Sequence, residues 1–305
     1  MFGKPFVRDL ISRSAENAAD RRRFFKSASV AGLGAAGASF LAATASAAEA
    51  PSDSAVLNFA LNLEYLEAQF YSYAVTGHGL PDKLTTGTGA LGTVIGSGEV
   101  RFRSREVREY AEEIAGDECA HVEFLRKALG SAAVAMPQID IRNSFTAAAR
   151  AAGLIGQGQT FDPYANENNF LLAAFIFEDV GVTAYKGAAP LISNKTYLDA
   201  AAGILAVEAY HAATIRASLF ERGLAREAGK ISDARDSLDG PGDKDQGIMR
   251  GGVANIVPAD GSGIAFGRGA DRVLNIVYLT PKKATSGGFF PKGVNGPINT
   301  SGGSS

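Results

Sequence analysis

The chain has 305 residues, with 30 basic and 32 acidic side chains and a formal charge of −2. This balance excludes the basic composition of a nucleic-acid-binding protein, so no nucleic-acid partner is expected. A single cysteine, Cys119, excludes an intramolecular disulfide. Stability must therefore come from a hydrophobic core, and 46% hydrophobic residues can supply one.

The first stretch of the chain has the features of an export signal. Three arginines at 21–23 precede a Gly/Ala-rich apolar run at 27–44 and the small-x-small pattern Ala45-Ser46-Ala47 that a signal peptidase cleaves. This arrangement resembles a twin-arginine signal and predicts a periplasmic or secreted protein, with residues 1–47 removed. A membrane anchor is the alternative, but the run is shorter than the roughly 20 strongly apolar residues of a span. No stable membrane span is expected after cleavage.

The next part of the chain is predicted to be all-α. Apolar residues recur at helical spacing in four long segments, at about 53–75, 101–129, 167–188 and 195–222. The connection at 130–167 is long, and a short helix is expected in it at 144–152. Four helices with one long crossover between the second and third are typical of a ferritin-like four-helix bundle. We assign residues 48–225 to this bundle.

Two of the four segments repeat a Glu-x-x-His motif, Glu118 to His121 and Glu208 to His211. Three residues span about one helical turn, so both side chains leave the helix from the same face. The sequence has three histidines, and the third, His78, lies in a Gly-rich loop where exposure is expected. Burying a carboxylate and an imidazole in an apolar stripe is costly without a partner. The repeat therefore points to metal.

Each of the other two segments carries acids within its apolar face. Aligning the first segment on the third places Glu64 over Glu178 and Tyr71 over Tyr185. Glu67, one turn after Glu64, is the alternative ligand, because shifting the alignment by three residues still pairs two acids. Glu67 and the two tyrosines are therefore candidates for the layer of side chains around the ligands.

Together these residues predict a dinuclear metal site with no catalytic residue beyond its ligands. One Glu from each of two helices and one Glu-x-x-His from each of the others give the set Glu64, Glu118, His121, Glu178, Glu208 and His211. The carboxylates neutralise two divalent cations, and each imidazole gives one metal a nitrogen donor. We expect Glu118 and Glu208 to bridge the ions and Glu64 and Glu178 to be terminal ligands. Iron and manganese both fit.

Three stretches of the chain resemble a known family: LNFALNLEYLEAQFY at 57–71, DECAHVEFLR at 117–126 and GGFFPKG at 287–293. They are similar to the ferritin-like family that includes plant desiccation-related proteins and their bacterial relatives. The resemblance covers roughly residues 53–296. It implies a ferritin-like bundle that binds metal, and it defines no activity.

Residues 226–305 are predicted to be a loop-rich C-terminal extension. Gly, Asp and Ser are frequent, and one short helix is expected at about 273–278, capped by Asp271. The adjacent aromatics Phe289 and Phe290 are expected to cover an apolar surface of the bundle. A surface for a partner subunit is the alternative, so a homo-oligomer stays open.

Two functions from different classes follow from the sequence. The first is an exported dinuclear iron or manganese enzyme, ferroxidase-like or manganese-catalase-like, that handles oxygen or peroxide in oxidative or desiccation stress. The second is a non-enzymatic, stress-protective or structural bundle with a structural metal or none. Metal binding would contribute to folding in either case, so turnover discriminates between them.

Overall fold

The computed structural model describes residues 50–303. The predicted twin-arginine signal, residues 1–47, lies outside the described residues. Within the described part of the chain, no helix is both long and apolar enough to cross a membrane.

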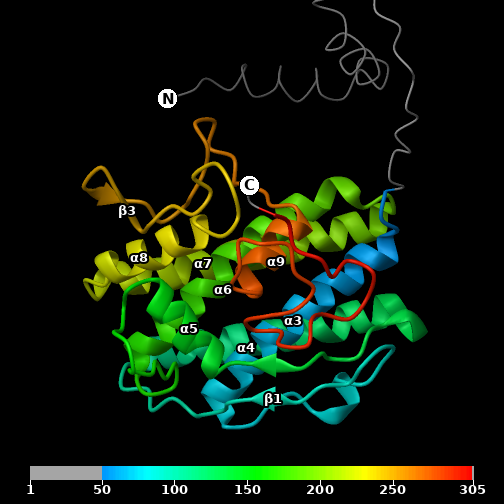
Figure 1. Ribbon diagram of the computed structural model, residues 1–305, viewed down its shortest axis with the longest axis horizontal. Helices are drawn as coiled ribbons and strands as arrows, with labels where there is room; N and C mark the ends of the chain where they lie inside the picture. The colour runs from blue at the N-terminus through cyan, green and yellow to red at the C-terminus, as the bar shows by residue number, and fades with distance from the viewer. Residues whose placement is uncertain (1–49, 304–305) are drawn as a thin grey trace, which may run out of the picture. The chain divides into compact units, whose positions relative to one another are not determined.

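Four long helices form a bundle (Figure 1): α3 (Asp53–Thr76), α4 (Arg105–Leu129), α6 (Glu167–Ala188) and α7 (Lys195–Glu221). The most extensive contacts join α3 to α4 and α6 to α7, and the two pairs meet where α3 contacts α6 and α4 contacts α7. The predicted four-helix bundle with one long crossover is confirmed.

Polar side chains fix where each long helix begins. The N-cap side chain accepts a hydrogen bond from a backbone N–H of the first turn in all four, at Ser52, Ser104, Asn166 and Asn194. The second helix begins at Arg105 rather than near 101, because the backbone N–H groups of Arg103 and Ser104 donate to the Glu167 carboxylate. Gly77 ends α3 in the left-handed conformation, with φ of 70°.

The two connections outside the bundle pair with each other. The α3–α4 connection contains η1 (Asp82–Leu84) and β1 (Val94–Ile95). The crossover from α4 to α6 contains η2 (Gly130–Ala132), β2 (Ile139–Asp140) and α5 (Asn143–Ala151). β1 and β2 are parallel, so the pairing ties the crossover to the α3–α4 connection. A further short turn, η3 (Ala189–Leu191), joins α6 to α7.

The C-terminal extension holds more structure than the sequence predicts. It begins with α8 (Ala225–Asp236), continues with the antiparallel pair β3 (Met249–Arg250) and β4 (Val253–Ala254), and includes α9 (Ala270–Val277). The short helix is present, but the Asp271 cap was wrong, because Gly269 is the N-cap and Asp271 lies in the first turn without a capping hydrogen bond. The boundary between bundle and extension stays a prediction.

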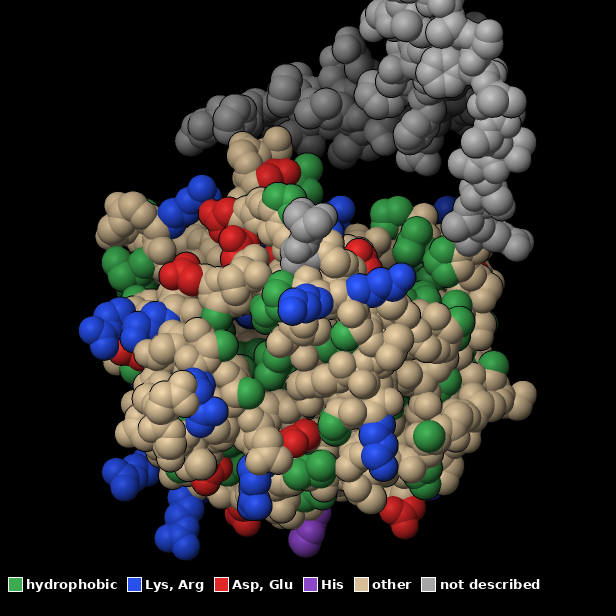
Figure 2. All heavy atoms as spheres, viewed as in Figure 1, with side chains coloured by type: hydrophobic (Ala, Val, Ile, Leu, Met, Phe, Trp, Pro, Cys, Tyr) green, Lys and Arg blue, Asp and Glu red, His purple; other side chains and the backbone are tan. Residues whose placement is uncertain are grey.

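The end of the chain lies on the bundle. Phe289 and Phe290 are fully buried, and the Phe289 ring packs against Phe145 of α5 and Phe177 of α6, with ring centroids 5.0 and 4.9 Å apart. Figure 1 shows the last coil running along α3. In the same view, Figure 2 shows a surface made mainly of backbone and uncharged polar groups, with acidic and basic side chains interspersed.

A buried ion network fastens the extension to α6 and α7. Its six members, all buried, are Asp179, Arg216, Arg235, Asp239, Asp245 and Arg268. Arg216 and Arg235 donate to Asp179 Oδ2 at 2.7 and 2.8 Å. Arg235 Nε lies 2.9 Å from Asp245 Oδ1, and Arg268 pairs with both Asp245 and Asp239. The three positive charges match the three negative ones.

Candidate metal centre

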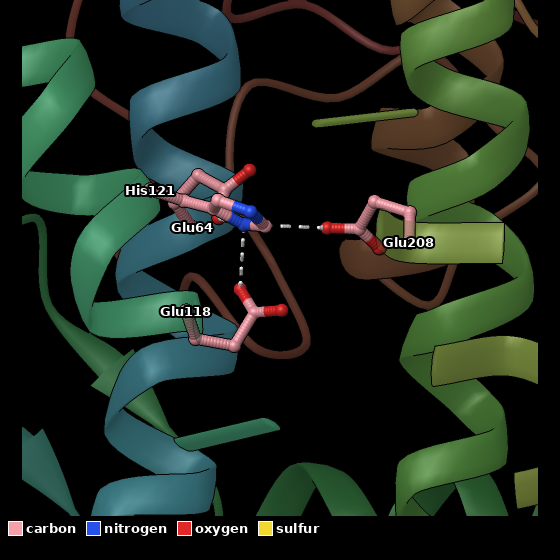
Figure 3. Close-up of side chains that lie close together, drawn as sticks. All are labelled: Glu64, Glu118, His121 and Glu208. Atoms are coloured by element: carbon pink, nitrogen blue, oxygen red, sulfur yellow. Dashed lines mark ion pairs between the residues drawn. The ribbon is translucent and has the colours of Figure 1, made fainter. Parts of the chain in front are cut away.

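The Glu and His residues of the four long helices converge in the bundle interior. One group contains Glu64, Glu118, His121 and Glu208, and a second contains Glu118, Glu178 and His211. In each group, one ligand atom from every member lies within 4.8 Å of the others, and all members are buried. Figure 3 shows the side chains of the first group meeting between the helices.

The first group surrounds one imidazole nitrogen. His121 Nδ1 lies 3.2 Å from Glu64 Oε2, 3.7 Å from Glu118 Oε2 and 3.9 Å from Glu208 Oε1. These residues come from α3, α4 and α7, so side chains from three helices meet at this nitrogen.

The second group repeats this arrangement on the other side of Glu118. His211 Nδ1 lies 3.2 Å from Glu118 Oε1 and 3.6 Å from Glu178 Oε2. Glu118 therefore directs one carboxylate oxygen to each imidazole, and the two rings are 6.4 Å apart between centroids. A carboxylate shared in this way is suited to bridge two ions.

Two tyrosines hold the carboxylates of Glu64 and Glu178 from the opposite helices. The Tyr71 hydroxyl of α3 donates to Glu178 Oε1 on α6, and the Tyr185 hydroxyl of α6 donates to Glu64 Oε1 on α3. Each tyrosine thus fixes the glutamate of the helix that faces it. This leaves the second oxygen of each carboxylate directed at a histidine.

Asp117 is a site residue that the sequence reasoning missed. Its Oδ2 lies 3.1 Å from His211 Nε2. A carboxylate on the outer nitrogen of a ligand histidine fixes the ring and its tautomer, which leaves Nδ1 free to face the cluster. The signal in the sequence is the acidic residue directly before the Glu118 motif, although nothing in the spacing shows that it reaches α7.

Glu64 and Glu67 occupy different places, although both are on the inward side of α3. Glu64 lies against His121, whereas Glu67 belongs to neither group. The Glu67 side chain is buried and forms no hydrogen bond within the described part of the chain. Of the two alternatives, the structure brings Glu64 to the imidazole. His78 is exposed, as expected.

Many polar atoms of the cluster have no hydrogen-bond partner among the described residues. They include both oxygens of Glu118 and of Glu208, one oxygen each of Glu64 and Glu178, and Nδ1 of both histidines. Buried polar atoms are nearly always paired, and leaving them unpaired costs free energy. The orphaned atoms are carboxylate oxygens and imidazole nitrogens, the donors that divalent transition metals take. The residues present therefore fit a metal centre.

The protonation of the cluster shows that it lacks positive charge. Burial works to raise the pKa of Glu118, but the two histidines beside it outweigh burial and lower that pKa to about 2. Burial works to lower the pKa of the imidazoles, but Glu118 and the neighbouring carboxylates raise it to about 10 for His121 and about 11 for His211.

The pKa values of Glu64 and Glu208 are raised, whereas the pKa of Glu118 is lowered. Burial, followed by the charge of Glu118, raises the pKa of Glu64 to about 7. Burial and the charges of four other glutamates raise the pKa of Glu208 well above its usual range. Without metal, then, burial and mutual repulsion shift Glu64 and Glu208 toward their protonated forms, and the carboxylates around the histidines shift these toward their cationic forms. Two divalent ions would take over that role.

Comparison with known proteins gives a family match over the bundle. The ferritin-like domain family matches residues 52–221, which include all four long helices and every residue of the two groups. This agrees with the predicted fold class. No solved structure matches the chain.

Two curated proteins are similar to the chain over most of its length. A desiccation-related protein, PCC13-62 of Craterostigma plantagineum, is 31% identical over 268 residues, which cover 80% of this chain and 83% of the relative. Ferritin-like catalase Nec2 of Nesocodon mauritianus is 26% identical over 261 residues, with the same two coverages. Both matches extend beyond the bundle, since 80% of the chain exceeds the 170 residues of the family match.

Proposed function

This chain belongs to the ferritin-like domain family, and from that premise we infer its function. We propose that it is an exported dinuclear metalloenzyme that handles oxygen or peroxide. Peroxide is the favoured substrate, because one relative is named a ferritin-like catalase. The observation that carries the proposal is Glu118, which lies between two imidazole nitrogens at 3.2 and 3.7 Å and joins two ligand groups.

The proposed ligands are the six residues that converge in the bundle. Glu118 would bridge the ions, and the Glu208 carboxylate, close to His121, would be the second bridging group. Glu64 with His121 and Glu178 with His211 would complete the two sides. Two ions of iron or manganese would supply open coordination positions and a change of oxidation state.

The chain's own groups prepare this chemistry in three ways. Tyr71 and Tyr185 hold the terminal carboxylates in place by donating hydrogen bonds. Asp117 orients the His211 ring. The four carboxylates are almost completely buried in the bundle, which keeps bulk water from them. A low-dielectric surrounding strengthens the electrostatic hold of the carboxylates on cations.

Release of dioxygen from hydrogen peroxide tests the proposal. The protein, without residues 1–47, would be loaded separately with manganese and with iron and compared with Glu118→Ala treated in the same way. We expect one metal to support conversion of two peroxide molecules to one dioxygen and two waters, and the variant to lose this activity. A fully loaded parent that neither consumes peroxide nor reduces oxygen would contradict the proposal.

The second candidate is a stress-protective bundle in which metal is structural or absent. The relative named as a desiccation-related protein favours it, with 31% identity to this chain. The two candidates differ in turnover and share the fold.

For the location we propose the periplasm or the exterior, reached through the twin-arginine signal at residues 1–47. Fusion of this segment to a reporter and substitution of Arg22 and Arg23 by Lys would test the route, and export that persists would contradict it.

A further inference from the structure

Glu67 is a buried acid that the proposed metal centre does not use. It lies on α3 one turn after Glu64 and is 6% exposed. Its side chain has no hydrogen-bond partner in the described chain. The charges around it are Glu64 on α3, Glu118 on α4, Glu178 on α6, and Glu208 and His211 on α7. A buried carboxyl without a partner contributes nothing to stability. Its place needs another explanation.

Glu67 lines a narrow crevice between α3, α6 and α9. The other walls are apolar, among them Leu63 of α3, Val180 of α6, Ile276 of α9 and Phe289 of the last coil. Figure 1 shows α9 beside α6 and α3 on the face that carries the last coil. The space open to the centre of a water-sized molecule is about 10 Å³, which is room for one such molecule.

The crevice approaches the metal centre at Gly181. This glycine lines it, and a Cβ at this position would overlap the Glu208 carboxylate. Because Gly181 has no side chain, only backbone separates this wall of the crevice from a proposed ligand. Burial, reinforced by Glu118, Glu178 and Glu64, raises the pKa of Glu67 well above its usual range.

We propose that this crevice admits a small uncharged molecule of peroxide size to the metal centre, and that Glu67 hydrogen-bonds the molecule on its way in. The inference rests on the proposed function and names its substrate class. The carboxyl oxygens of Glu67 accept hydrogen bonds, which hydrogen peroxide can donate from its own O–H groups. The narrow apolar walls exclude organic substrates by size and disfavour anions, because a charge there would be desolvated.

Four variants test the proposal in the metal-loaded protein. Ile276→Phe narrows the crevice from α9, Glu67→Leu removes the hydrogen bonds, and Glu67→Gln keeps a donor and an acceptor. Leu238→Phe is the matched control, because Leu238 lines a neighbouring cavity of about 140 Å³ and not the crevice. Metal content, kcat and kcat/KM for hydrogen peroxide, and the unfolding midpoint of the chelated protein would be measured for each.

We expect Ile276→Phe and Glu67→Leu to lower kcat/KM at least about tenfold while kcat changes less, because entry and not chemistry is impaired. Glu67→Gln should retain kcat/KM within about threefold, and Leu238→Phe should match the parent. Metal content should not change, and the chelated Glu67→Leu protein should unfold no more easily than the parent.

The outcomes separate this inference from the proposed function. A parent without metal or turnover overturns both. A parent that turns over, together with fully loaded Ile276→Phe and Glu67→Leu variants of parental kcat/KM, overturns the entry route alone. Loss of metal and a lower unfolding midpoint in Glu67→Leu would instead assign Glu67 a structural role and also overturn it.

Discussion

Two buried clusters of charge adjoin α6, and the adjacent residues Glu178 and Asp179 belong to one cluster each. Glu178 points to the histidines, with Oε2 3.6 Å from His211 Nδ1. Asp179 points to the arginines, with Oδ2 2.7 Å from Arg216 Nη1. Three arginines match three aspartates in the arginine network. In the glutamate cluster, four carboxylates face only two histidines.

The difference shows what each cluster is suited to do. The arginine network balances its own charge without any ligand, because its cations belong to the chain and also donate to backbone carbonyls, as Arg216 does to Gln246 and Gly247. Some of its carboxylate oxygens, such as Oδ1 of Asp179, still lack a hydrogen-bond partner in the described chain. The glutamate cluster has more carboxylates than histidines, and both oxygens of Glu118 and of Glu208 lack partners within the described chain. The first cluster holds the C-terminal extension in place. The second requires added cations.

Breaking the arginine network should have the largest effect on stability. Asp179→Ala leaves Arg216 and Arg235 buried without their shared carboxylate, which costs about 3–5 kcal/mol. Urea unfolding of the chelated protein would measure this loss, with exposed Glu112→Ala on α4 as the control. A loss close to that of the control would show that the network holds nothing together.

Metal should stabilise the protein through the glutamate cluster alone. Addition of Mn²⁺ or Fe²⁺ at about 100 times its dissociation constant should raise the free energy of unfolding by about 2.7 kcal/mol for each ion bound. The same addition should leave Glu118→Ala unchanged, since that variant lacks the shared ligand. Thermal unfolding with and without metal measures both, and equal shifts in parent and variant would place the metal elsewhere.

Removing a tyrosine hydroxyl should weaken metal binding without removing a ligand. Tyr71→Phe and Tyr185→Phe each free one carboxylate to rotate, and loss of such a partner typically lowers metal affinity about 10- to 100-fold. Competition with a chelator would measure the affinity. Tyr210→Phe is the control, because Tyr210 is 74% exposed on α7. Parental affinity in both variants would exclude a positioning role for the hydroxyls.

The smallest effect concerns Glu67 and pH. Its pKa in the folded protein lies well above the ordinary value of 4.5, so the folded state retains a proton that the unfolded state loses. As pH rises above the ordinary glutamate pKa of 4.5, the parent should therefore lose stability relative to Glu67→Gln. The loss is up to about 1.4 kcal/mol per pH unit. Urea unfolding of both chelated proteins between about pH 5 and pH 7 measures the difference. A constant difference would contradict it.

The neighbouring groups share in that difference. The charged or titratable side chains near Glu67 are Glu64, Tyr71, Glu118, Glu178, Glu208 and His211. Because the charge of Glu67 raises the pKa of Glu208, the measured difference includes the response of Glu208 to the loss of that charge.

The sequence predicts the bundle well because its signals are repeated. Four long apolar-periodic segments fix the helices to within a few residues, and the two Glu-x-x-His motifs identify residues that the fold brings together. The start of α4 was less predictable. It depends on Glu167, which is 62 residues away from Arg105 in sequence and accepts hydrogen bonds from the backbone just before the helix.

The features that the sequence does not reveal depend on contacts between distant segments. Helix α8 has little apolar periodicity, because Arg235 and Ser232 are among its buried residues, and their partners lie on other elements. Asp117 looks like an ordinary surface acid until α7 brings His211 to it. Glu64 and Glu67 both face inward, and only the packing of α3 against α4 shows which of them meets His121.

The central claim, that the chain holds two metal ions around Glu118, is tested most directly by metal content. Elemental analysis of the protein without residues 1–47 would be compared with Glu118→Ala and with Glu112→Ala. The account predicts about two equivalents of iron or manganese in the parent and in Glu112→Ala, and none in Glu118→Ala. A folded parent that holds no metal after exposure to either ion would contradict it.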